Sequence, residues 1–141
     1  MTAQRTLVLL KPDAVRRGLV GEVLGRFEAK GLSLVALQLR HIDAAQAYRH
    51  YAEHVERDFY PPLRDFVTSG PLVALVLEGD EAVEVVRTLN GATDGRKAAP
   101  GTIRGDLGRD WGLKVQQNIV HGSDSPESAA REIAIWFPEH A

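Results

Sequence analysis

Four short runs of apolar residues predict the strands of a sheet. Residues 6–10 are rich in branched side chains, and Lys11-Pro12-Asp13 closes this run because proline lacks the backbone donor that a central strand needs. Residues 71–77 are apolar throughout, which is typical of a strand buried on both faces. Residues 32–39 alternate imperfectly between apolar and polar, and residues 115–120 predict a last strand.

Between these runs, apolar residues recur at the three- and four-residue spacing of helices. Asp43 and the pair Ser125-Pro126 are residues that commonly begin a helix, and Asp80 is predicted to open another. Pro61-Pro62 predicts a short helix that ends near Gly70. The predicted apolar faces are Leu19 or Val20, Val23, Leu24 and Phe27; Ala44, Ala47, Tyr48 and Tyr51; Ala82, Val85, Val86 and Leu89; and Ala130, Ile133, Ala134 and Phe137.

The order of these elements predicts an α+β fold of the ferredoxin-like βαββαβ class. This fold is an antiparallel four-stranded sheet, here expected to carry its helices on one side and an inserted helical hairpin. The length of 141 residues predicts one domain over residues 1–141. Residues 90–112 hold six glycines and few apolar side chains, which predicts a long loop of functional importance.

Composition narrows the class of protein. Hydrophobic residues at 44% and charged residues at 26% are close to globular averages, which excludes disordered and coiled-coil chains. The net charge of −2 argues against a protein that coats nucleic acid or an anionic membrane, so nucleic acid is an unlikely partner. The absence of cysteine excludes disulfides and thiolate chemistry. We expect a cytoplasmic protein with no signal peptide or membrane span.

His121 is the leading candidate for chemistry, because it stands at the end of a predicted strand and small polar residues follow it. A neutral imidazole is a competent nucleophile near pH 7 when a second group fixes its tautomer. Ser123, Asp124 and Glu132 are the local candidates for that group. The competing interpretation is a hydrogen-bonded histidine with no catalytic role.

Three cations suit a polyphosphate ligand if the fold brings them together. Lys11 follows the first strand, Arg87 belongs to a helix, and Arg104 lies in the glycine-rich stretch. No phosphate-cradling glycine motif of the usual kinds occurs, so side chains must hold any nucleotide. Phe59 and Tyr60 stand next to a rigid turn, where one of them could stack on a nucleobase or both could pack in the core.

A second group of histidines is interpreted as exposed surface. His50 and His54 are one helical turn apart, but no third metal ligand stands nearby in the sequence. The residues predicted to be solvated are His41, His50, Glu53 and His54.

Seven blocks in order carry a family resemblance: Lys11-Pro12-Asp13, Arg17-Gly18-Leu19-Val20-Gly21-Glu22, His50-Tyr51, Ser69-Gly70-Pro71, Gly91-Ala92-Thr93, Pro100-Gly101-Thr102-Ile103-Arg104-Gly105-Asp106 and Asn118-Ile119-Val120-His121-Gly122-Ser123-Asp124-Ser125. Together they resemble the nucleoside diphosphate kinase family over residues 6–137, nearly the whole chain. The resemblance implies a ping-pong phosphotransferase that moves the γ-phosphate of a nucleoside triphosphate, usually ATP with Mg²⁺, onto a nucleoside diphosphate. The intermediate would be a phosphohistidine on His121.

The resemblance also implies a role for each matched residue, with no protein ligand for the metal, since Mg²⁺ would be held mainly by the nucleotide phosphates. The phosphates would be held by Lys11, Arg87, Arg104 and Thr93. The base would stack on Phe59, and the ribose hydroxyls would bind to Asn118 and Lys11. Tyr51 would support Lys11, and His121 would be oriented by Glu132 and Ser123.

The chain departs from the family pattern at three places. Ala14 replaces a glycine, which is tolerated provided its φ is negative. Gly95 replaces a proline in a loop that resembles one at subunit contacts, and residues 107–117 form a longer segment than usual. The resemblance implies a homo-oligomer, either a tetramer or a hexamer.

Two other classes of function compete with the enzyme. One is a nucleotide-binding module that has lost catalysis, which is disfavoured because the matched catalytic positions are all filled. The other is nucleic-acid binding, which the charge of −2 and the absence of a basic stripe make a weak side activity.

Overall fold

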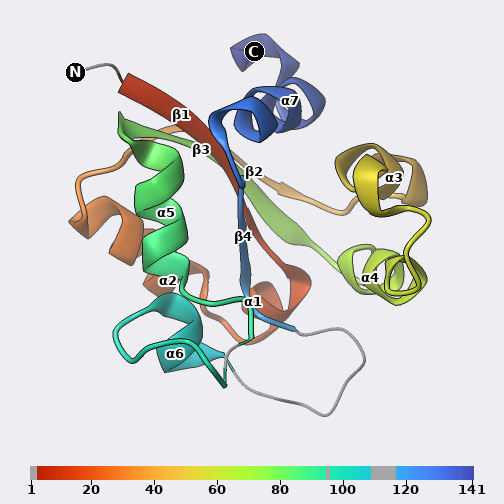
Figure 1. Cartoon of the computed structure of the whole chain (residues 1–141), viewed down its shortest axis with the longest axis horizontal. Coiled ribbons are helices and arrows are strands. Elements are labelled where there is room, and N and C mark those ends of the chain that lie inside the picture. Colours follow the sequence, from red (N-terminus) through yellow and green to blue (C-terminus); the bar gives the residue numbers. More distant parts are fainter. Residues whose placement is uncertain (1–2, 95, 109–116) are drawn as a thin grey trace.

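A four-stranded antiparallel sheet with the strand order β2-β3-β1-β4 forms the centre of the molecule (Figure 1). The computed structural model describes residues 3–94, 96–108 and 117–141. This strand order, with every neighbouring pair antiparallel, confirms the predicted α+β fold of ferredoxin-like type. The strands are β1 (Ala3–Leu10), β2 (Ser33–Arg40), β3 (Leu72–Asp80) and β4 (Val120–Gly122).

The predicted helix starts at Asp43 and Ser125 are confirmed by their hydrogen bonds. The side chain of Asp43 accepts from the backbone N–H of Gln46, and that of Ser125 accepts from Ser128. Among the described residues, no helix combines the length and apolar character needed to cross a bilayer. The helices are α1 (Pro12–Arg16), α2 (Val20–Ala29), α3 (Ala44–His50), α4 (Tyr60–Val67), α5 (Ala82–Asn90), α6 (Ile103–Leu107) and α7 (Pro126–Trp136), with 3₁₀ turns η1 (Ala52–His54) and η2 (Pro138–His140).

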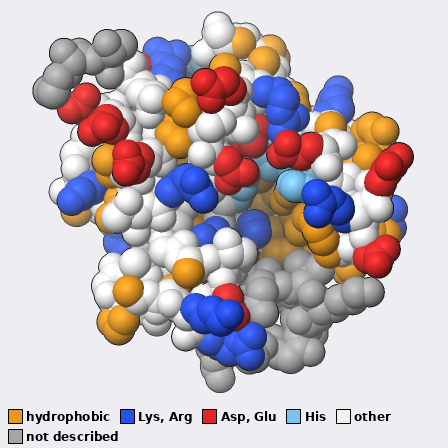
Figure 2. All heavy atoms as spheres, in the orientation of Figure 1, with side chains coloured by type: hydrophobic (Ala, Val, Ile, Leu, Met, Phe, Trp, Pro, Cys, Tyr) orange, Lys and Arg blue, Asp and Glu red, His pale blue; other side chains and the backbone are white. Residues whose placement is uncertain are grey.

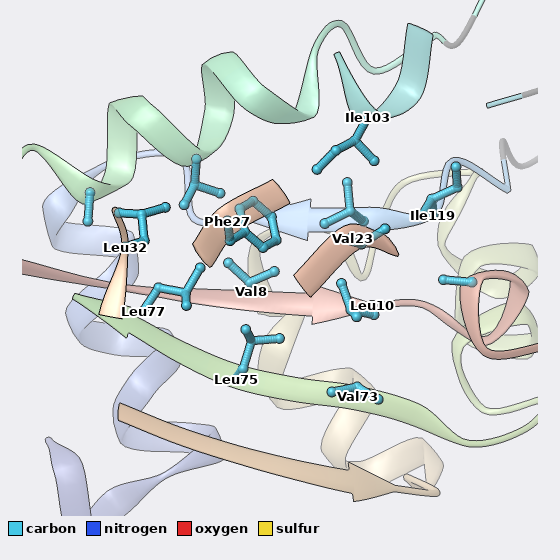
Figure 3. Packing of buried hydrophobic residues seen from close by; sticks show 14 residues of the cluster. Val8, Leu10, Val23, Phe27, Leu32, Val73, Leu75, Leu77, Ile103 and Ile119 are labelled. Carbon is cyan, nitrogen blue, oxygen red and sulfur yellow. The ribbon is translucent and has the colours of Figure 1, made fainter. Parts of the chain in front are cut away.

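Each face of the sheet carries its own hydrophobic core, so the expectation of helices on one side only is wrong. Along β1, Val8 faces α2 and α5, whereas Leu9 faces α3, α4 and α7. Figure 3 shows the first core, in which Phe27 of α2 packs over the strand residues. The second core exists because the hairpin of α3 and α4 and the C-terminal α7 cover the opposite face.

The structure also corrects several local predictions. Ala130 and Ala134 of α7 are exposed, because the helix buries the face of Ala129, Glu132 and Ile133 instead. Tyr48 of α3 is exposed for a similar reason, since Gln46 and His50 share the buried face with Ala47. Small or amphipathic residues leave the helical face ambiguous in the sequence.

Two short helices were not expected from the pattern. Pro12 occupies the first turn of α1, where its missing N–H costs nothing. Helix α6 lies within the predicted loop 90–112 and begins at Thr102, whose side chain accepts from the N–H of Gly105. The last strand was predicted over residues 115–120, but β4 covers Val120–Gly122. Residues 115 and 116 lie outside the described residues.

Candidate active site

His121 lies in the middle of β4, at an edge of the sheet, and its ring is fixed by a buried carboxylate. It pairs with Leu9, so its side chain points to the face covered by α7. Its Nε2 lies 2.8 Å from Oε1 of Glu132. The Ser123 hydroxyl donates to the same oxygen at 2.9 Å, and both Ser123 and Glu132 are buried. Two of the three local candidates thus form one network with His121.

This network fixes the tautomer of His121. An ionised carboxylate only accepts hydrogen bonds, so Nε2 of His121 carries the proton that it donates to Glu132. The other ring nitrogen, Nδ1, therefore keeps its lone pair. Asp124, the third candidate, does not take part: its side chain is exposed, and its backbone carbonyl accepts from Arg87 at 3.3 Å.

A strained backbone segment precedes His121. Ile119 has a φ of 77°, a left-handed conformation that a β-branched residue rarely adopts. Its N–H donates to Oδ2 of Asp13 at 3.0 Å, and its carbonyl accepts from the backbone N–H of Lys11 at 2.7 Å. Because Ile119 itself is fully buried, these bonds and its packing hold the segment in this shape.

Asp13 stabilises the segment before His121, and the sequence marked it only as part of a motif. It is buried in α1, and desolvation raises the pKa of its carboxyl, although Lys11 opposes this rise. Its neighbour Ala14 has a negative φ, as the replacement of the family's glycine requires. The motif Lys11-Pro12-Asp13 thus supplies both the end of β1 and the carboxylate that holds Ile119.

A cavity of about 770 Å³ opens beside His121, and the three predicted cations line it. Figure 2 shows Lys, Arg and His side chains together in the hollowed part of this face. Lys11 lies between β1 and α1, Arg87 in α5 and Arg104 in α6, and the fold brings all three to this cavity. The cavity is also lined by Thr93, Asn118 and His121.

Lys11 and Arg104 are buried cations with lowered pKa values. Burial, followed by repulsion from Arg104, lowers the pKa of Lys11 to about 8. Burial, followed by repulsion from Arg87, lowers the pKa of Arg104 to about 10. Both groups are charged at pH 7, and the attraction of Asp13 for Lys11 does not cancel the effects of burial and repulsion, so this part of the cavity favours an anionic ligand.

Asn118 joins two sides of the cavity. Its Oδ1 accepts from Nζ of Lys11 at 2.9 Å, and its Nδ2 donates to the backbone carbonyl of Thr93 at 2.8 Å. Thr93 itself is exposed. The two residues expected to hold ribose hydroxyls are therefore already in contact with each other in the protein alone.

Arg104 binds the protein backbone with three of its five N–H donors. Nε donates to the carbonyl of Asn118 at 3.3 Å, Nη1 donates to that of Gly91 at 2.8 Å, and Nη2 donates to that of Val120. It therefore braces both ends of the strained segment and still has donors left for a ligand. Arg87, in contrast, is exposed, and its Nη1 donates to the backbone carbonyl of Asp124.

Tyr51 and Phe59 are not among the described residues that line the cavity. The hydroxyl of Tyr51 is buried without a hydrogen-bond partner, so the structure holds no bond from it to Lys11. Burial raises the pKa of this hydroxyl, and the nearby Glu132 adds to the rise. Phe59 is 39% exposed just before α4, with the ring of His54 at 5.6 Å.

His50 is the clearest error of the surface interpretation, because it is 3% exposed. Trp136 Nε1 donates to its Nδ1 at 2.9 Å, and its ring lies edge-on to His121 with centroids 4.8 Å apart. Burial, with the nearby His121 next in importance, lowers the pKa of His50 well below its ordinary value, so the ring is neutral. His41 and Glu53 are exposed as predicted, and His54 is half-buried. The three-residue spacing from Ala47 places His50 on the same side of the helix, but this spacing alone does not show that the side is buried.

His50, His121 and Glu132 form the one group of three metal-capable side chains found in the described part of the chain, with ligand atoms within 4.8 Å. All three side chains are already hydrogen-bonded, because Nε2 of His121 donates to Glu132 and Nδ1 of His50 accepts from Trp136. This group is therefore better suited to orient His121 than to bind a metal ion.

The fold and the site together define an α+β phosphotransferase, in which an oriented imidazole faces a cavity lined by cations. The model of the family described as "Nucleoside diphosphate kinase" matches residues 4–141. The chain belongs to the nucleoside diphosphate kinase family.

Known relatives cover nearly all of the chain. A nucleoside diphosphate kinase of Nocardioides sp. is 74% identical over 134 residues, which are 95% of this chain and 96% of the relative. One from Mycobacteroides abscessus is 62% identical over 136 residues, which are 96% and 97% of the two chains.

Two solved structures share the fold. The enzyme of Halobacterium salinarum, in complex with CDP, has a TM-score of 0.90 and 47% identity, over 96% of this chain and 88% of that chain. The enzyme of Borrelia burgdorferi, a transition-state mimic with bound vanadate and ADP, has a TM-score of 0.89 and 40% identity, over 96% and 87%.

The activity follows from the family. The protein is an enzyme that transfers the γ-phosphate of a nucleoside triphosphate to a nucleoside diphosphate. The reaction is a ping-pong exchange through a phosphohistidine, as expected from the sequence motifs.

The bond from Ile119 to Asp13 predicts different outcomes for two substitutions. Asp13→Asn keeps a carbonyl oxygen that accepts from the buried N–H of Ile119, whereas Asp13→Ala leaves this N–H without a partner. The alanine variant should be less stable than the asparagine variant by about 1–3 kcal/mol, measured by urea unfolding at pH 7. Substitution of the exposed Asp58 by alanine is the control. Equal stability of the two Asp13 variants would contradict this account.

Proposed function

We propose that His121 is the nucleophile and that it attacks through Nδ1. The lone pair of Nδ1 forms a bond to the γ-phosphorus while the bond to the bridging oxygen breaks, and the nucleoside diphosphate leaves with that electron pair. The second half-reaction reverses these steps with another diphosphate as the acceptor. The observation that carries this proposal is the 2.8 Å contact of Nε2 with Glu132, which leaves Nδ1 as the free nitrogen.

The use of histidine fits a reversible transfer. A phosphoramidate keeps a transfer potential close to that of the anhydride from which it came, whereas a serine ester would trap the phosphoryl group. Glu132 and Ser123 act as positioning residues, because they hold the ring and stabilise the positive charge that forms on it. His50, which is neutral and edge-on to the ring, adds no competing charge.

The remaining site residues are proposed to bind the nucleotide. Lys11, Arg87 and Arg104 neutralise the phosphate oxygens, where most of the catalytic stabilisation of phosphoryl transfer arises. The relatives bound to CDP and to ADP with vanadate support a nucleoside diphosphate in this cavity. Thr93 assists at the phosphates, Asn118 and Lys11 bind the ribose, Tyr51 supports Lys11, and Phe59 stacks on the base.

Mg²⁺ is proposed to enter with the nucleotide. The metal-capable group found in the described part of the chain orients His121. The carboxylates that line the cavity, those of Glu81, Glu84 and Asp124, are exposed and do not belong to this group. Such a lining fits a metal held by phosphate oxygens rather than by a protein cage. When bound, Mg²⁺ supplies charge neutralisation to the phosphates. The enzyme is proposed to act in the cytoplasm, where nucleotide pools are used.

A homo-oligomer is proposed on the basis of the edge strand β2. Leu34, Leu37 and Leu39 are 48%, 42% and 65% exposed. Their partners on β3 are Leu77, Leu75 and Val73, which all face the first core, so the three leucines share that face. An edge strand with an exposed apolar face is a common site of subunit contact. The proposed assembly is a tetramer or a hexamer. Gly95, in the loop that resembles one at subunit contacts, and residues 109–116 of the longer segment lie outside the described residues.

The nucleophile is tested by labelling. With ATP labelled in the γ-phosphate, the wild-type protein should acquire label that is lost in acid and kept in base, as expected for phosphohistidine. His121→Ala should acquire none. His41→Ala is the matched control, because His41 is exposed and contacts Thr68, far along the chain from the site. Retention of acid-labile label in His121→Ala would overturn the assignment.

The pKa of Lys11 predicts how ADP binding depends on pH. Lys11 is protonated below a pKa of about 8 and neutral above it. Since phosphate favours the charged form, the affinity for ADP should fall as pH rises from 7 to 9.5, approaching roughly tenfold per unit at the upper end. Lys11→Arg should show a nearly flat profile, because arginine stays charged. Calorimetric titration measures both, and parallel profiles would contradict the role of Lys11.

The apolar face of β2 is tested by molar mass. Leu37→Glu should shift the protein to smaller species in size-exclusion chromatography with light scattering, because a carboxylate cannot be buried against a partner without cost. Tyr48→Glu is the matched control, since Tyr48 is 56% exposed on α3. An unchanged mass for Leu37→Glu would exclude this face as the contact.

A further inference from the structure

Asn90 is a buried amide in the wall of the cavity to which neither the motifs nor the proposed mechanism assigns a role. It is the last residue of α5, is 2% exposed and lines the cavity. Its Oδ1 is fully buried and has no hydrogen-bond partner. Among the described residues that line the cavity, no other has a buried side-chain polar atom in this state.

The amide lies close to the reacting residue. A Cβ placed on Gly122 would come within 3.0 Å of Nδ2 of Asn90 and within 2.9 Å of Val86. Gly122 directly follows His121 in β4, so its lack of a side chain lets α5 approach the strand at this point. Asn90 is therefore packed against the backbone that carries His121.

The surroundings of Asn90 favour an apolar side chain if packing alone decides. Val86, one helical turn earlier on the same face, belongs to the first hydrophobic core. An unpaired carbonyl at such a position lowers stability, whereas leucine would fill similar space without this cost. A buried polar group without a partner calls for an explanation outside the protein's own contacts.

We infer that the carboxamide of Asn90 is an additional ligand for the phosphate groups of the nucleotide. Phosphate oxygens accept hydrogen bonds at neutral pH, so the amide binds them through Nδ2, the end that lies against Gly122. Oδ1 keeps its buried position, because a phosphate oxygen cannot donate to it. This inference rests on the proposed function, because it requires a nucleotide in the cavity.

The cations attract the phosphates by their charge, and Asn90 would add a directional hydrogen bond to a phosphate oxygen. Arg104 donates to the carbonyl of Gly91, the residue after Asn90, so the end of α5 is tied to the cation cluster. A neutral donor next to Gly122 can bind a phosphate oxygen without adding to the repulsion that lowers the pKa of Lys11 and Arg104. Asn90 would therefore strengthen the binding of the phosphates and leave the binding of the nucleoside part unchanged.

The test compares ADP with adenosine in the full-length protein. Asn90→Leu should weaken ADP binding at least tenfold in calorimetric titration, leave adenosine binding unchanged, and leave the Tm of the free protein equal or higher. Asn90→Asp should weaken ADP binding further, because it adds a negative charge beside the phosphates. Gln46→Leu is the matched control: Gln46 is also a buried amide with an unpaired atom, but it is not among the described residues that line the cavity.

Two results would overturn the inference. If Asn90→Leu binds ADP as tightly as the wild-type protein does, Asn90 is no phosphate ligand. A lower Tm with equal loss of ADP and adenosine binding would assign Asn90 a structural role only. The proposed function is judged separately, by ADP binding and labelling of the wild-type protein. If the wild-type protein fails these, both proposals fall.

Discussion

The hydrogen bond from the backbone N–H of Ile119 to the carboxylate of Asp13 is the constraint on which the site depends. It stabilises a left-handed residue whose strain is of order 1–3 kcal/mol, immediately before the strand that carries His121. Without this turn, Asn118 could not direct its amide to Lys11 while Val120 enters the sheet beside Leu10. The conformation at Ile119 thus sets the position of Lys11 relative to the imidazole of His121.

Charge distribution explains how a chain with a net charge of −2 can hold a polyphosphate. Lys11 and Arg104 are buried close together, and the lowered pKa values show that the folded protein disfavours their charge in the absence of an anion. A bound phosphate would offset both the cost of burying these charges and their mutual repulsion. The affinity of the cavity for anions is therefore local, and the rest of the surface need not be basic.

The sequence predicted the features that depend on neighbours in the chain. The strands at β1 and β3 and the helix starts at Asp43 and Ser125 follow from short-range pattern and chemistry, and so the fold class could be predicted. The family motifs identified Lys11, Arg87 and Arg104 as residues of one site, and the structure places all three at the cavity. The roles of the individual residues are proposals.

What the sequence left ambiguous depends on contacts between distant elements. His50 is buried because Trp136 approaches from α7, 86 residues away, and spacing within α3 alone does not show this. Glu132 determines which face of α7 is buried, since its carboxylate must reach His121, and a pattern based on hydrophobicity places alanines there instead. The polar residues of a site are the ones that a hydrophobic pattern assigns to the wrong face.

Because β4 is an edge strand, the residues that orient His121 and the cations that line the cavity can act from opposite faces of the sheet. His121 points to the face of α7, where Glu132 and Ser123 orient it, while Gly122 lies against α5 on the opposite face. A central strand would separate these faces by its neighbours on both sides. At an edge, an imidazole held from one face through Nε2 can still border a cavity whose cations come from the other face. The orientation of the ring and the neutralisation of a bound phosphate are therefore supplied independently.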